Sequence, residues 1–178
     1  MVKKIVQKED KVLRKEAKLI PISEIKSSKI KKILQEMKMA LKSQSDGVAI
    51  AAPQIGYSLS IFIVSGKIFD KDFLSEDRTK FENKKEYPAD IVFINPVISK
   101  LSREKDWVPE GCLSVRWLYG KTYRSKKASV TAYDESAKKF TRGASGLLAQ
   151  IFQHETDHLK GVLFIDHAED VKEEIPNK

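Results

Sequence analysis

Apolar residues recur every three or four positions near both ends of the chain, and this spacing predicts helices there. Residues 27–44 carry apolar side chains on one face and lysines on the other, and a serine can cap the start. Residues 145–160 show the same spacing and stop at Gly161, so we expect a second helix with a buried face. Residues 10–17 can form a short helix capped by Asp10.

Between these helices, short apolar or alternating runs predict strands. The expected strands are 60–65, 90–100 with an interruption at Asn95-Pro96, 126–135, and a hairpin partner at 138–144. We interpret 47–58 as a loop that approaches another group closely, and the segment around Cys112 as turn-rich. Residues 66–89 are polar and predict a long exposed loop insertion. The pattern predicts one α+β domain over 1–178, with antiparallel β-sheets packed around a central C-terminal helix.

Composition places the chain among soluble globular proteins. Hydrophobic residues make up 41% and charged residues 33% of the 178 positions. The apolar runs stay well short of the roughly 20 residues that a membrane helix needs, and the basic N-terminus lacks the apolar core of a signal peptide. We therefore expect a cytoplasmic protein without a membrane partner. With Cys112 as the single cysteine, no intramolecular disulfide can form.

The positive charge is concentrated in the first quarter of the chain. The net charge is +8; residues 1–45 contain 13 Lys or Arg against 5 Asp or Glu, and residues 46–178 contain 20 of each. Such a basic face can attract RNA, although a solvated lysine-rich helix is the simpler interpretation. There is no RGG run and no interleaving of aromatic with basic residues, which weakens the nucleic-acid interpretation. We expect no DNA partner.

The sequence QHETDH at 153–158 carries the strongest chemical signal. Its two histidines, His154 and His158, are four positions apart and therefore project from one face of the predicted helix, so both rings can reach one ion. Glu155 points elsewhere around the helix, where its carboxylate can reach a water at that ion. This is the HExxH pattern, in which the glutamate acts as general base. Two surface histidines that share a helix by accident are the simpler alternative.

A third protein ligand is needed, and Cys112 is the favoured candidate. A third histidine six residues after the second is excluded, because position 164 is Phe. The glutamates of the C-terminal tail look peripheral, and His167 is interpreted as a surface residue. Cys112 lies in PEGCLS, where Gly111 relieves crowding of the backbone, and a thiolate suits a borderline-soft divalent ion. Cysteine with two histidines leaves one coordination position open, as catalytic sites do.

Three segments together resemble the peptide deformylase family. They are GVAIAAPQIG at 47–56, EGCLS at 110–114 and QHETDH at 153–158, in the order of that family's motifs. The resemblance covers nearly the whole chain apart from 66–89. It implies a hydrolase that removes the formyl group from N-formylmethionine of newly made polypeptides. It also implies a transient contact with the ribosome in some members, which the acidic tail of this chain does not support.

The resemblance implies a role for each motif residue. Cys112, His154 and His158 would hold one divalent metal ion, Fe²⁺ in the cell, with Zn²⁺ or Ni²⁺ found in purified protein. A hydroxide formed at the metal would attack the formyl carbonyl, and Glu155 would take the water's proton and pass it to the leaving amine. The side-chain amide of Gln54 and the backbone N–H of Leu113 would hold the oxyanion.

Further residues match the family's substrate pocket by position. They are Val48, Ala49, Val108, Leu147, Gln150 and Ile151, although simple core packing accounts equally well for the apolar ones. Ala49 stands where the family motif usually has Gly, and Arg116 where it has Pro. Gln150 replaces a residue that is apolar in many relatives. Glu110 and Asp157 are candidates for orienting the ligands. We expect these departures to alter specificity rather than activity.

Two other functions remain open from the sequence. One is a zinc peptidase that uses the same HExxH helix and gives Cys112 no role. The other is a basic RNA- or ribosome-binding protein that needs no metal. The metal content of a Cys112→Ala variant separates the first from a deformylase, and salt-sensitive RNA binding without metal would indicate the second.

Overall fold

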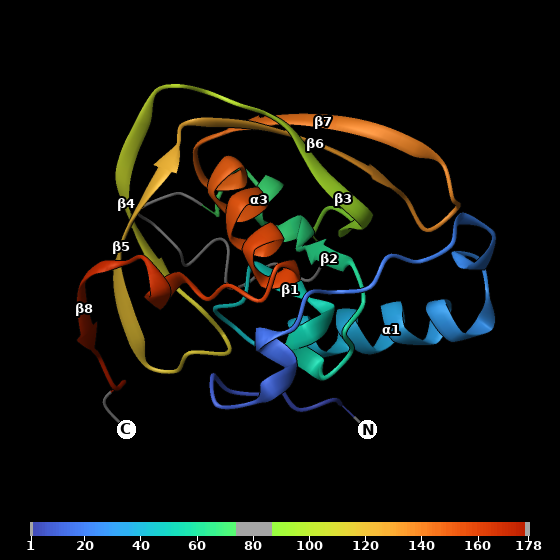
Figure 1. Ribbon diagram of the computed structural model, residues 1–178, viewed down its shortest axis with the longest axis horizontal. Helices are drawn as coiled ribbons and strands as arrows, with labels where there is room; N and C mark the ends of the chain where they lie inside the picture. Colours follow the sequence, from blue (N-terminus) through green and yellow to red (C-terminus); the bar gives the residue numbers. More distant parts are fainter. Residues whose placement is uncertain (1, 74–86, 177–178) are drawn as a thin grey trace.

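The computed structural model describes residues 2–73 and 87–176, which form two antiparallel β-sheets around a central helix (Figure 1). That helix is α3, Gly146–Leu159. The larger sheet has the order β1 (Ala49–Ala51), β2 (Ile61–Val64), β3 (Ile91–Leu101), β6 (Lys127–Tyr133), β7 (Lys139–Ser145). The smaller sheet has the order β4 (Lys105–Gly111), β5 (Leu118–Ser125), β8 (Glu169–Glu173). The expected α+β class with antiparallel sheets and a C-terminal helix is confirmed.

The larger sheet packs directly on α3. Phe62 and Phe93 pair across β2 and β3 and stack with ring centroids 4.5 Å apart, and Phe152 of α3 lies 5.2 Å from the Phe93 ring. All three side chains are fully buried, which stabilises the fold by roughly 1.5–3 kcal/mol for each. This aromatic cluster fixes the helix that carries His154 and His158 on a rigid support.

Of the remaining helices, α1 follows its predicted boundaries closely. α1, Ser28–Lys42, is capped by the Ser27 hydroxyl, which accepts from the Ile30 N–H, and its apolar face is buried. The predicted helix at 10–17 is shorter: η1, Lys11–Arg14, is a 3-10 helix capped by Asp10. The other 3-10 helices are η2 (Ile22–Glu24), η3 (Ala52–Ile55), η4 (Gly66–Phe69) and η5 (Phe164–Asp166).

Three local predictions need correction. The segment 47–58 is not simply a loop, because it contains β1 and η3 and is mostly buried. The segment around Cys112 is not merely turn-rich, because β4 and β5 flank it as a regular hairpin. The predicted loop 66–89 begins with η4, whose buried Gly66 donates its N–H to the Asp90 carboxylate at 2.9 Å. Its central part, 74–86, lies outside the described residues.

The expected break at Asn95-Pro96 appears within one continuous strand. The pairing of β3 with β6 shifts register between Ile94 and Val97, and Asn95 has a φ of 50°. The Asn95 side chain holds this irregularity in place, because it both accepts from the Ile20 N–H at 2.9 Å and donates to the Ile20 carbonyl at 2.7 Å. The strand therefore continues past the proline.

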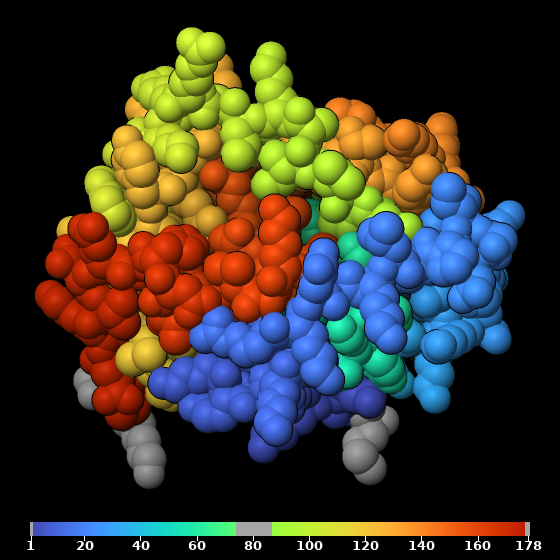
Figure 2. Space-filling model, viewed as in Figure 1, coloured from blue at the N-terminus to red at the C-terminus, as the bar shows by residue number. Residues whose placement is uncertain are grey.

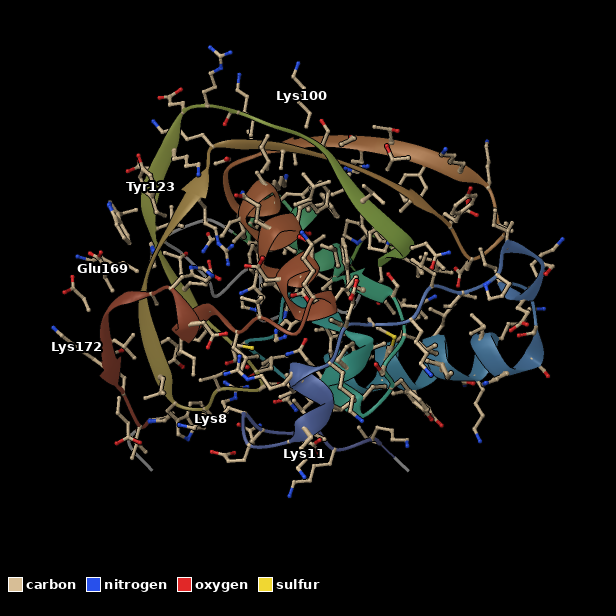
Figure 3. The ribbon with its side chains drawn as sticks, in the orientation of Figure 1. Lys8, Lys11, Lys100, Tyr123, Glu169 and Lys172 are labelled. Atoms are coloured by element: carbon tan, nitrogen blue, oxygen red, sulfur yellow. The ribbon has the colours of Figure 1, made fainter. Side chains whose placement is uncertain are left out.

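The smaller sheet exposes its outer face. Tyr123, Glu169 and Lys172 point away from the body of the molecule in Figure 3. The beginning of the chain, in dark blue, lies at the lower edge of the molecule, next to the red C-terminal region, as the space-filling view shows (Figure 2). Arg14 of this segment pairs with Asp166, and Gly161, at a φ of +74°, packs on the Arg14 backbone.

Within the described residues, no helix is long and apolar enough to cross a membrane.

Candidate metal centre

The structure brings the three expected metal ligands together. Cys112 follows the last residue of β4, whereas His154 and His158 lie one turn apart on α3. One ligand atom from each residue lies within 4.8 Å of the others, and the Cys112 Sγ is 3.2 Å from the His158 Nε2. The two imidazole rings have centroids 4.9 Å apart. One thiolate and two imidazoles, held this close, fit a borderline-soft divalent ion.

A buried charge network orients His154. Its Nδ1 lies 2.6 Å from the Glu110 carboxylate, which leaves Nε2 for a metal. Glu110 also accepts from the Thr122 hydroxyl at 2.6 Å and from the Arg124 guanidinium at 2.6 and 3.1 Å. Arg124 donates in turn to Asp157 at 2.6 Å. The hairpin β4–β5 and helix α3 are thus joined by one continuous set of ion pairs directly behind the candidate ligand.

The pKa values of the network follow from burial and partners. Burial raises the pKa of Glu110, but hydrogen bonds from His154 and Arg124 outweigh it and hold this pKa well below its usual value. Burial lowers the pKa of His154, but the hydrogen bonds with Cys112 and Glu110 raise it well above its ordinary value. Burial also holds the pKa of His158 well below its ordinary value, so this ring is neutral, whereas His154 would release a proton on binding a metal.

Glu155 is a buried carboxyl group at the edge of the cavity. Only 3% of the residue is exposed, and within the described part of the chain its Oε2 has no hydrogen-bond partner. Burial raises the pKa of Glu155 to about 7. A carboxyl group with this pKa can both accept and release a proton near neutral pH.

Polar groups surround the Cys112 sulfur. The Ser114 N–H donates to Sγ at 3.4 Å, and the Gln54 side-chain amide donates to it at 3.6 Å. Gln54 also donates to the Ser114 hydroxyl at 3.2 Å, while its Oε1 accepts from the Ala51 N–H at 2.8 Å. These contacts fix the amide so that its N–H₂ side faces the sulfur. The expected oxyanion donors, Gln54 and Leu113, therefore lie beside the candidate ligand.

A cavity of about 370 Å³ opens over these groups and contains most of the expected substrate residues. Its lining includes Val48, Ala49, Gln54, Leu113, Leu147, Gln150, Ile151 and Glu155, but not Val108. Gln150 is held by two acceptors, the Pro109 carbonyl at 2.8 Å and the Glu110 carboxylate at 3.1 Å. One wall also carries Arg116, which donates to Asp46 at 2.5 and 3.0 Å.

Two residues of the site were not predicted from the sequence. Arg124 is almost completely buried on β5, and Gln7 reaches the turn after Cys112 from the N-terminal segment. Thr122 and Arg124 are alternate positions of β5 and are buried together, whereas Lys121 and Tyr123 are exposed, but this alternation becomes visible only in the structure. The sequence contains no signal for Gln7 either.

Comparisons with known proteins agree on one family. The family model described as polypeptide deformylase matches residues 2–174. The chain is 37% identical over 158 residues to peptide deformylase 2 of Clostridium acetobutylicum, covering 89% of each. It is 36% identical over 162 residues to the chloroplastic peptide deformylase 1A of Solanum lycopersicum, covering 91% of this chain but only 58% of that protein. A Met-Ala-Ser-bound class I type b peptide deformylase from Acinetobacter baumannii superposes with a TM-score of 0.77 at 27% identity, covering 94% and 99% of the two chains.

Proposed function

The chain belongs to the polypeptide deformylase family, and on that premise we propose that it hydrolyses the formyl group from N-formylmethionyl peptides. The observation that carries this proposal is the convergence of Cys112, His154 and His158, with Cys112, His154 and the buried Glu155 lining one cavity. The cavity is open on one side and apolar on much of its lining, as a site for an extended peptide with a methionine side chain requires.

Cys112, His154 and His158 would hold one divalent ion, for which we propose Fe²⁺ in the cell and Zn²⁺ or Ni²⁺ as substitutes. A bound ion of this kind supplies Lewis acidity, which acidifies water and polarises a carbonyl. The protein fixes the donors in advance: Glu110 sets the tautomer of His154, and burial keeps His158 neutral. The donor set also leaves a side open to the cavity, as catalysis needs.

Glu155 would take the proton of the attacking water and return it to the departing amine. Its Oε2 is without a partner in the described structure, so the group is available, and its raised pKa suits both halves of the transfer. Gln54 and the Leu113 N–H would donate hydrogen bonds to the oxygen of the formyl group as negative charge develops there. A neutral amide is suited to this task because it stabilises the oxyanion without competing as a metal ligand.

The peptide would lie along the segment that leads into β1, with Val48 and Ala49 against its backbone. Leu147, Gln150 and Ile151 would surround the methionine side chain, since all three line the cavity on the α3 side. The Met-Ala-Ser tripeptide in the Acinetobacter baumannii structure supports a peptide of this class in the corresponding fold. Val108 lies outside the cavity lining, which favours a packing role for it rather than a substrate contact.

The decisive experiment measures hydrolysis of formyl-Met-Ala-Ser by anaerobically prepared protein, with metal analysis of the same sample. We expect release of formate and free Met-Ala-Ser, and no cleavage of internal bonds in an unformylated peptide of the same length. Cys112→Ala should lose its metal and its activity together, with Ser99→Ala on the exposed part of β3 as a matched surface control. Cleavage of internal peptide bonds by the wild type would instead identify a zinc peptidase, and full metal content and activity in Cys112→Ala would remove Cys112 from the ligand set.

A further inference from the structure

The turn that follows the candidate sulfur ligand is held by a residue from the opposite end of the chain. Gln7 donates from Nε2 to the Leu113 carbonyl at 3.0 Å, across 106 positions of sequence. Its Oε1 accepts from the Arg116 N–H at 3.2 Å. Because one partner is a backbone carbonyl and the other a backbone N–H, the two contacts fix which end of the amide is nitrogen. Gln7 therefore bridges the turn from Leu113 to Arg116.

The Leu113 carbonyl belongs to the same peptide group as the Ser114 N–H, and that N–H points at the Cys112 sulfur from 3.4 Å. The three groups form a chain: the Gln7 amide donates to the carbonyl, and the N–H of the same peptide group donates to Sγ. A hydrogen bond to a peptide carbonyl polarises the amide and makes its N–H a stronger donor. Gln7 thus acts on the sulfur through one intervening peptide group.

The segment that carries Gln7 is anchored on both sides. The neighbouring Val6 donates its N–H to the Gln54 carbonyl at 2.9 Å, and the Asp10 N–H donates to the Gln7 carbonyl at 2.8 Å. Leu13 is buried in a cluster with Val115 of the same turn, and Cys112 packs against that cluster. In Figure 3 the labelled Lys8 marks this segment beside the loop at the lower end of β4 and β5. The fold therefore fixes the position of the Gln7 backbone, so its side chain is held beside the turn.

We propose that Gln7 is a positioning residue for the metal centre, which orients the Leu113–Ser114 peptide group and strengthens its N–H···S hydrogen bond to Cys112. Hydrogen bonds to a ligating sulfur draw electron density from it and so tune both metal affinity and metal–sulfur bonding. The proposal rests on Cys112 being a ligand, as in the proposed function, but not on the identity of the substrate.

The test uses Co²⁺ as a spectroscopic probe in the full-length protein, without substrate. Gln7→Met keeps the length of the side chain but loses the donor, and we expect the sulfur-to-cobalt charge-transfer band to move to longer wavelength. The Co²⁺ dissociation constant, measured against a competing chelator, should rise about threefold to tenfold, less than for loss of a direct partner of a ligand. Gln7→Glu, which keeps the acceptor and loses the donor, should change the band in the same direction.

Gln44→Met is the matched control, because Gln44 accepts from the Arg116 guanidinium at 3.1 Å but, within the described residues, makes no hydrogen bond to the Leu113–Ser114 peptide group or to the Cys112 sulfur. It should leave the cobalt band unchanged. Unfolding of the metal-free variants shows whether each is folded, and Gln7→Glu replaces Gln7→Met if the latter is not. An unchanged band and affinity in the folded Gln7 variant, an equal shift in Gln44→Met, or no sulfur–cobalt band in the wild type would each overturn the proposal. Failure to hydrolyse formyl peptides, with the band behaving as expected, would overturn the proposed function alone.

Discussion

Helix α3 and the hairpin β4–β5 both deliver ligands to the candidate metal centre, but they are held in different ways. α3 is enclosed by apolar packing, with Phe152 fully buried against the larger sheet. The hairpin belongs to the smaller sheet, and its outer face exposes Trp107 and Tyr123 to 44% and 52%. Cys112 is placed by a small buried cluster around Leu13 and Val115 and by hydrogen bonds from Gln54 and Ser114, not by the large aromatic core that holds α3. We expect a change at Glu155 on α3 to reduce turnover while the metal is retained, and changes in the hydrogen-bond network of the hairpin to weaken metal binding.

The largest effect should come from α3 itself. Glu155→Gln keeps the shape of the side chain but removes the proton acceptor, so turnover should fall about 10²- to 10⁴-fold while the metal content stays at the wild-type level. Steady-state formate release and metal analysis on one preparation measure both. Glu169→Gln, on the exposed strand β8, is the matched control and should keep full turnover. Robust turnover in Glu155→Gln would remove Glu155 from the chemistry.

A substitution at Arg124 tests the ion pairs that join the hairpin β4–β5 to helix α3. Arg124→Met leaves the buried Glu110 and the partly buried Asp157 without their shared cation, which should lower the free energy of unfolding by about 3–5 kcal/mol. The affinity for metal should fall about 10- to 100-fold, because Glu110, the partner of the His154 Nδ1, is no longer held by the guanidinium. Urea unfolding and chelator competition measure the two quantities. Arg103→Met, at an exposed position, should change neither; equal behaviour of the two variants would show that the network does not carry the link.

The burial of α3 also predicts a pH dependence in the metal-free protein. The pKa of Glu155 rises from 4.5 to about 7 in the folded state, so between these values the unfolded chain releases a proton that the folded chain retains. The free energy of unfolding should therefore fall as pH rises from 4.5 to 7, by about 3 kcal/mol at 1.36 kcal/mol for each pKa unit. Urea unfolding of wild type and Glu155→Gln at pH 5 and pH 8 isolates this contribution. Parallel pH profiles of the two proteins would contradict it.

The smallest effect should come from Gln150, which reaches from α3 to the hairpin at Pro109. Gln150→Leu makes the cavity wall more apolar, and Glu110 keeps its bonds from Thr122 and Arg124. We expect the KM for formyl-Met peptides to fall about fourfold, the equivalent of about 0.8 kcal/mol of apolar contact, with kcat nearly unchanged. Gln35→Leu on the exposed face of α1 is the control. An increased KM would show that the amide contributes directly to substrate binding.

The difference between α3 and the hairpin β4–β5 also explains which elements could be predicted from the sequence. α3 could be predicted because its apolar spacing and Gly161 are local signals, and the pair His154 and His158 lies within one turn. β4 and β5 lack such signals, because their sequences are charged and β4 contains Pro109. Their pairing becomes visible only in the structure, in the register of the two backbones. β8 is a further case, since all five of its residues are exposed and charge patterning alone gives no strand.

The residues of the candidate site likewise fall into those that could be predicted from the sequence and those that could not. The candidate ligands and Glu155 could be proposed from the sequence, because cysteine, histidine and glutamate in these short motifs are the residue types that bind a metal and move a proton. Arg124 could not, because a lone arginine on a strand is usually solvated, and its burial depends on Glu110 and Asp157 arriving from two other elements. Gln7 could not be inferred for a related reason: its partners are backbone atoms, and no side-chain pattern records them.

The order of synthesis determines when the contact between Cys112 and His158 can form. The sulfur and the imidazole that meet at 3.2 Å are 46 positions apart, so during synthesis Cys112 emerges well before either histidine exists. Gln7, in contrast, is among the first residues made, and its hydrogen bond to the Leu113 carbonyl can form only after 106 further residues have been added. The centre can therefore assemble only after nearly the whole polypeptide has been produced, through contacts of high sequence separation that form slowly. Until then Cys112 would be a free thiol, and its oxidation in the nascent chain would remove the proposed sulfur ligand.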